Sequence, residues 1–127
     1  MKPAPRPQPE ARGYTPWGTS AAIDLHGCSF AALADPGIIT AFVRELIAAI
    51  GMRAHGPLHL ERFGTGELEG WSAMQFIETS SITVHADEVS ARCFIDVFSC
   101  RPFDADRAAV VALEHFGGRP LVRVLRR

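Results

Sequence analysis

The chain has 127 residues, of which 47% are hydrophobic and 21% are charged, and its formal net charge is −1. These values are typical of a folded globular protein of one-domain size and argue against a disordered chain. The near-zero charge gives no broad attraction to nucleic acid, and no apolar stretch of the sequence is long enough to cross a membrane.

The N-terminal residues 1–16 are predicted to form a flexible, proline-rich arm, because prolines occupy positions 3, 5, 7 and 9. This segment lacks the apolar core of a signal peptide. Residues 17–127 are expected to form a single domain.

The helices and strands follow from hydrophobic spacing, in chain order. A short strand is expected over residues 21–26. Asp35 is positioned to cap a helix whose first residue is Pro36, and Gly51 is positioned to end it. Further strands are predicted near residues 55–63, 71–77, 81–85, 91–99 and 121–125, with Pro57 indicating an edge strand or an irregular start.

A second helix, capped by Asp104 and ended by Gly117, is predicted between the last two strands. The order β-α-β-β-β-β-α-β predicts an α+β fold, a two-layer sandwich with a mainly antiparallel sheet and two helices on one face. The arginine-rich stretch 119–127 is interpreted as a solvated strand edge rather than a binding patch.

The three cysteines, Cys28, Cys93 and Cys100, form no CxxC pair, and an odd number argues against a disulfide framework. A reducing cytoplasm is therefore the expected location. No residue spacing typical of a metal site or a phosphate-binding loop is present, so no metal is expected.

The run from Thr79 to His85 is the most informative stretch for function, because it places two serines at the start of a predicted strand and a histidine at its end. A hydroxyl next to a strained backbone carbonyl can attack it and replace the amide by an ester. β-Elimination of that ester cuts the chain and leaves dehydroalanine, which hydrolyses to a pyruvoyl group. Such a ketone can form a Schiff base with an amine substrate and act as an electron sink for decarboxylation. From the residues alone, the simpler alternative is that Ser80 and Ser81 are turn residues.

His85 and Cys100 are the other candidates for chemistry on this part of the chain. His85 can act as a general acid or base, or it can be a half-exposed surface histidine. Cys100 precedes Arg101, a cation that favours the thiolate, but a small buried side chain is the usual role of a free cysteine. Strict alternation along a strand puts Ser80 and His85 on opposite faces, so a bend or bulge near Ser81 is expected if they are to meet.

The spacing of these residues resembles the short prokaryotic S-adenosylmethionine decarboxylases, which are small pyruvoyl enzymes of polyamine synthesis. The likeness covers residues 20–126. The family's Glu-Ser-His-Ile-Ser-Ile-His segment is similar to residues 79–85, and its Asp-Leu/Val-Phe-Thr-Cys strand end is similar to residues 96–100. Its opening Asp-Leu-Tyr-Gly-Cys turn is similar to residues 24–28, and its His-Arg-Phe stretch to residues 61–63.

The resemblance implies a role for each matched residue. Ser80 would become the pyruvoyl cofactor after cleavage of the bond that joins it to Thr79. His85 would assist that cleavage, and Cys100 would return a proton to the substrate after carbon dioxide leaves. Phe63 and Ser72 would line the pocket for S-adenosylmethionine, with Phe63 stacking on the adenine. A homodimer with active sites near the subunit interface is implied as well.

The chain differs from the family beside the predicted cleavage site. Thr79 stands where the family has glutamate, Ser81 where it has histidine, and residues 86–89 where it has Thr-Trp-Pro-Glu. The main hypothesis is a decarboxylase of S-adenosylmethionine, which supplies the aminopropyl donor for spermidine synthesis. Because of these differences, two alternatives are considered beside it. One is a pyruvoyl decarboxylase of another amine such as ornithine or arginine. The other is a non-cleaving homologue that binds a ligand or regulates a partner.

Overall fold

The computed structural model describes residues 3–4 and 16–127. Most of the predicted proline-rich arm, 1–16, therefore lies outside the described residues. The described part contains six strands, three α-helices and one short 3-10 helix. They are β1 (Thr19–His26), α1 (Phe30–Leu33), α2 (Pro36–Ala49), β2 (Ala54–Phe63), η1 (Gly66–Leu68), β3 (Gly70–Ile77), β4 (Ser80–Asp87), β5 (Arg92–Ser99), α3 (Ala105–Phe116) and β6 (Arg119–Arg126).

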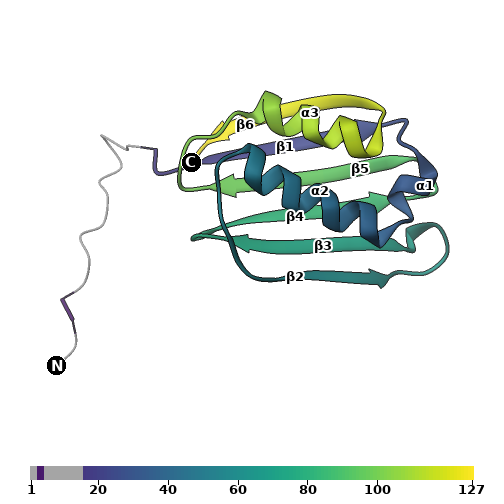
Figure 1. Cartoon of the computed structure of the whole chain (residues 1–127), viewed down its shortest axis with the longest axis horizontal. Coiled ribbons are helices and arrows are strands. Elements are labelled where there is room, and N and C mark those ends of the chain that lie inside the picture. Colours follow the sequence, from purple (N-terminus) through teal and green to yellow (C-terminus); the bar gives the residue numbers. More distant parts are fainter. Residues whose placement is uncertain (1–2, 5–15) are drawn as a thin grey trace.

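The strands form one sheet in the order β2-β3-β4-β5-β1-β6, and every neighbouring pair is antiparallel. Helices α2 and α3 lie side by side across one face of this sheet (Figure 1). The predicted α+β sandwich with two main helices on one face is thereby confirmed. Among the described residues, no helix is long and apolar enough to span a membrane.

The two main helices begin and end as their sequences predict. The Asp35 carboxylate accepts a hydrogen bond from the backbone N–H of Gly37 at 2.8 Å, and Pro36 is the first residue of α2. Asp104 accepts one from the backbone N–H of Arg107 at 3.1 Å at the start of α3. Gly117 follows α3 with a φ of 68°, a backbone conformation that glycine adopts without steric cost.

The core lies between the helices and the alternate strand residues that face them. Phe42 of α2 and Phe116 of α3 are both fully buried and meet edge to face, with ring centroids 5.1 Å apart. The strands contribute β-branched and leucine side chains that are likewise nearly inaccessible. They are Ile23, Leu25, Ile82, Val84, Ile95 and Val97.

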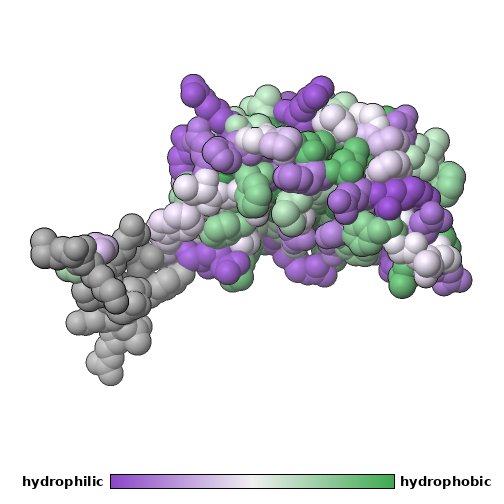
Figure 2. Space-filling model, turned by 90° about the horizontal axis from the view of Figure 1, so that it is seen from below, coloured by the Kyte–Doolittle hydropathy of each residue, from purple (hydrophilic) through white to green (hydrophobic). Residues whose placement is uncertain are grey.

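Among the described elements, no helix covers the other face of the sheet, which we call the open face. Because side chains alternate along strands, strand pairing arranges this face in cross-strand rows. One row runs through Phe76, Ser81 and Phe98, and another through Ser72, His85 and Phe94. Figure 2 views the molecule from the side of β2 and shows apolar side chains interspersed with hydrophilic ones.

The sequence missed two short elements. Helix α1 and the 3-10 helix Gly66–Leu68 have three or four residues each, too few for a hydrophobic period to be recognised. Strand β4 also begins at Ser80, one residue before the predicted start, and extends to Asp87. The irregularity predicted at Pro57 is present, since β2 is an edge strand whose pairing with β3 shifts register between His55 and His59.

Candidate active site

The tight turn between β3 and β4 contains the peptide bond predicted to break. Glu78 and Thr79 connect the two strands, and Ser80 is the first residue of β4. Thr79 has a φ of 60°, a left-handed conformation that is a steric outlier for a β-branched residue. Such backbone strain costs about 1–3 kcal/mol and persists only where the surroundings impose it.

Ser80 contacts the end of the neighbouring strand. Its side chain is on the helix-covered side and only 6% exposed, and its Oγ accepts a hydrogen bond from the backbone N–H of Cys100 at 2.9 Å. Cys100 directly follows β5, which pairs with β4 in the register Ser81 to Phe98. The antiparallel pairing thus brings together two residues that are twenty positions apart.

The thiol of Cys100 lies against the same turn. Its Sγ is 3.2 Å from the Thr79 Oγ1 and 3.8 Å from the carbonyl oxygen of Glu78. The hydrogen bond with the Thr79 hydroxyl is the largest cause that lowers the pKa of Cys100, followed by the contact with Ser80 and, more weakly, by the charge of Arg101. A lowered pKa raises the thiolate fraction at neutral pH, which suits a group that exchanges protons.

Replacing Thr79 with valine is expected to raise the pKa of Cys100, because valine keeps the shape of threonine and removes the hydroxyl. The pH profile of Cys100 alkylation by iodoacetamide should then shift to higher pH, whereas Thr79→Ser should leave it near the parent profile. Both variants are measured in the Ser80→Ala background, in which no cleavage can occur. Coincident profiles for the valine and serine variants would contradict this assignment.

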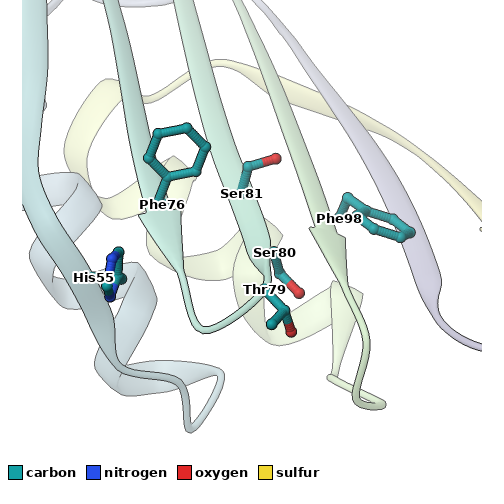
Figure 3. Close-up of a pocket in the computed structure, with 6 residues that line it drawn as sticks. All are labelled: His55, Phe76, Thr79, Ser80, Ser81 and Phe98. Atoms are coloured by element: carbon teal, nitrogen blue, oxygen red, sulfur yellow. The ribbon is translucent and has the colours of Figure 1, made fainter. Parts of the chain in front are cut away.

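A cavity of about 420 Å³ opens at this end of the sheet. Figure 3 shows that Phe76 and Phe98 stand on either side of Ser81, with Thr79 and Ser80 at the end of β4 and His55 on β2. Sequence reasoning missed both phenylalanines and His55 as site residues. Their alternation within strands was visible, but the strand pairing that gathers them was not.

Ser72 and His85 form a second group on the open face. They are directly opposite each other on β3 and β4, and the Ser72 Oγ is 2.8 Å from the His85 Nδ1. They line a separate cavity of about 290 Å³, together with Phe63, Glu61 and other side chains. Phe63 is 57% exposed, so its ring is accessible to a ligand.

The structure does not bring Ser80 and His85 together. The β4 strand pairs with β3 and β5 without a register shift, so the bend or bulge expected near Ser81 is absent from β4. Five residues of strand span about 17 Å, and the two side chains lie on opposite faces. Two of the predicted site residues, Ser80 and Cys100, form one group, and Ser72, His85 and Phe63 form another.

Glu88, the carboxylate nearest to the glutamate of the resembled Thr-Trp-Pro-Glu segment, is not in either cavity. It is 7% exposed, and both of its oxygens accept hydrogen bonds from the Arg62 guanidinium. Arg62 also lies over the ring of Trp71, with its guanidinium carbon 5.8 Å from the ring centroid. Glu88 therefore fastens the β4–β5 turn to the edge strand β2. The sequence showed that this carboxylate is displaced relative to the family segment, but it did not show that Arg62 is its partner.

Cys28 and Cys93 are buried, and neither forms a disulfide. Burial raises the pKa of the Cys93 thiol far above its ordinary value, and burial also raises the pKa of Cys28. Both are buried packing side chains of the core.

Comparison with known proteins agrees with the observed fold. The family model for S-adenosylmethionine decarboxylase matches residues 19–127. The crystal structure of the adenosylmethionine decarboxylase from Aquifex aeolicus superposes with a TM-score of 0.76 at 17% sequence identity, covering 90% of this chain and 92% of that chain. At this identity the superposition shows a shared fold. The comparison with curated proteins gave no match. Because the family model extends over all of the described strands and helices, the chain belongs to the S-adenosylmethionine decarboxylase family.

Proposed function

We propose that this protein cleaves its own chain between Thr79 and Ser80 and then decarboxylates S-adenosylmethionine. The observation that carries the proposal is the strained Thr79 conformation beside a buried serine hydroxyl that is held by the end of β5. Membership of the decarboxylase family supports the same conclusion. The product would supply an aminopropyl group for spermidine synthesis.

Cleavage needs no external reagent other than water. The Ser80 Oγ adds to the Thr79 carbonyl carbon, the C–N bond breaks, and the serine nitrogen takes the hydroxyl proton, which leaves an ester. Loss of the Ser80 Cα proton then breaks the Cβ–O bond and releases the Thr79 carboxylate. The resulting enamine tautomerises to an imine, water adds, and ammonia leaves the new N-terminal ketone.

The residues around Ser80 fit a pyruvoyl group at this position. The cavity beside it has two aromatic walls, Phe76 and Phe98, and its polar lining comes from Thr79, Ser80, Ser81 and His55. When formed, the pyruvoyl group supplies the electron sink for decarboxylation. Cys100 lies within reach and has a lowered pKa, so we assign it the return of a proton to the substrate carbon.

Phe63 and Ser72 are proposed to bind the substrate, because they share the second cavity with His85. The exposed Phe63 ring offers a surface for the adenine to stack on. The uncrosslinked thiols of Cys28, Cys93 and Cys100 fit the reducing cytoplasm in which we place the reaction.

We further propose that the enzyme acts as a homodimer in which each site combines the two groups of residues. Ser80 and Cys100 of one subunit would meet Ser72 and His85 of the other. The separation of these groups within one chain supports the proposal, since no rotamer of His85 spans about 17 Å along a strand. Two sheets could face each other through the open face, where the second cavity lies and where Phe76, Ser81 and Phe98 line the first. The Ser80 side chain is turned to the helix-covered side, but Ser80 also lines the first cavity at the end of the sheet, and the partner's imidazole would have to reach it there.

The test is release of labelled carbon dioxide by the purified protein from carboxyl-labelled S-adenosylmethionine, ornithine and arginine, each in a separate reaction. We expect labelled carbon dioxide to be released from S-adenosylmethionine alone. This release should be lost after the protein has been treated with sodium cyanoborohydride in the presence of substrate. Release from a basic amino acid would change the substrate assignment. A protein that binds the nucleoside but releases nothing would be a ligand-binding homologue.

A further inference from the structure

A pair of charges bridges the turn that contains the scissile bond. The Arg101 Nη2 is 3.1 Å from the Glu78 Oε2, and the two side chains are 55% and 49% exposed. Glu78 lies two residues before Ser80, and Arg101 immediately follows Cys100. The ion pair therefore joins the residue at one end of the strained turn to the strand end that holds Ser80.

Arg101 is fixed by contacts on its other side as well. Its backbone N–H donates a hydrogen bond to the Ser99 Oγ at 3.0 Å, and its Nη2 lies 3.9 Å from the Met52 Sδ. Ser99 itself is fully buried. The backbone of Arg101 is thus anchored to the buried end of β5, and its guanidinium has one weak contact besides the one with Glu78.

We propose that the Glu78–Arg101 ion pair is a positioning device for self-cleavage, which holds the β3–β4 turn against the end of β5 so that Thr79 keeps its left-handed conformation. The inference rests on the proposed cleavage between Thr79 and Ser80. Three further contacts also hold the turn against Cys100. The Cys100 N–H donates to the Ser80 Oγ, and the Cys100 thiol contacts the Thr79 hydroxyl and the Glu78 carbonyl oxygen. The ion pair is the member of this set that depends on charge, and the experiment uses that property.

The first measurement is the rate of cleavage of freshly refolded precursor, followed by intact mass. Glu78→Gln and Arg101→Gln should each slow cleavage by about two- to fivefold, the effect of a partly exposed ion pair. The charge-reversed double variant Glu78→Lys with Arg101→Glu should recover part of the loss. About 1 M sodium chloride should slow the parent protein but not Arg101→Gln, because salt screens an exposed pair.

Arg92 and Asp87 provide a matched control. Their ion pair, with Nη2 and Oδ2 in contact, joins the same two strands β4 and β5 at the opposite end, far from the scissile bond. Arg92→Gln should leave the cleavage rate and its salt dependence unchanged. If it slows cleavage as much as Arg101→Gln does, or if reversal of the charges gives no recovery, the positioning role is wrong.

The second measurement does not need cleavage and is made in the Ser80→Ala background. Above the pKa of the Cys100 thiol, the rate of its alkylation by iodoacetamide reports access to the sulfur, which contacts the turn on one side. Glu78→Gln and Arg101→Gln should each raise this rate by about twofold or more, and Arg92→Gln should not. Equal rates in all of these variants would overturn the inference. A parent chain that never cleaves would refute the proposed function, while this alkylation rate would still decide whether the ion pair holds the turn.

Discussion

Replacing Ser80 with alanine is expected to leave the chain uncut, whereas the parent protein should separate into fragments 1–79 and 80–127. Alanine removes the hydroxyl that forms the ester with the Thr79 carbonyl, and without that ester there is no bond for the elimination step to break. An uncatalysed amide bond is stable under these conditions. The expected effect is therefore complete loss of cleavage and of carbon dioxide release.

Intact-mass analysis of purified protein measures this result and identifies the new terminus. A pyruvoyl terminus makes fragment 80–127 lighter than a serine terminus would, by the mass of one ammonia. Ser90→Ala, a serine in the exposed β4–β5 turn, is the control and should cleave normally. A parent chain of one uncut mass, or a cut chain that begins with serine, would refute the pyruvoyl mechanism.

Mixing two inactive variants is expected to restore cleavage. Ser80→Ala retains His85 but has no nucleophile, and His85→Ala retains Ser80 but lacks the imidazole. If each site is built from two subunits, a mixed dimer contains one complete site, in which the Ser80 of the His85→Ala chain meets the His85 of the Ser80→Ala chain. After random exchange of subunits, about half of the His85→Ala chains should be cut.

The experiment refolds the two variants together from denaturant and follows the masses of the two chains, which differ and can be distinguished. Each variant refolded alone is the control and should stay uncut. Mixing Ser80→Ala with the double variant Ser80→Ala His85→Ala should also give no cleavage. If co-refolding restores nothing while the parent protein cleaves, the site is completed within one chain, and the proposal of a shared site is wrong.

Much of the fold followed from local sequence. Asp35 and Asp104 marked the helix starts because a short acidic side chain satisfies free backbone N–H groups there, and alternating apolar residues marked β3, β4 and β5. Helix α1 and the 3-10 helix η1 were missed because three or four residues make only about one helical turn, which is too short for a repeating hydrophobic pattern. The bounds of β4 and β6 were underestimated, since backbone pairing continues past the apolar residues that reveal a strand.

The candidate site was predictable only in part. Spacing identified Ser72, Ser80, His85 and Cys100, but it predicted one cluster where the structure has two. The register of β4 with its neighbours decided this, because uninterrupted pairing keeps residues 80 and 85 on opposite faces. Glu78 and Arg101 were adjacent to predicted residues and were still not recognised, since an ion pair across twenty-three positions has no local pattern.

By itself, the sequence determined the class of fold, the family and the peptide bond at which chemistry is expected, because these depend on residue types and their spacing along one chain. Only the tertiary structure decided that Thr79 is strained, that Ser80 is held by Cys100 and that His85 is held apart from both. The physical reason is that contact between strands depends on pairing register and on the face each side chain occupies. Both are set by the packing of the whole sheet against its helices rather than by neighbours in the sequence.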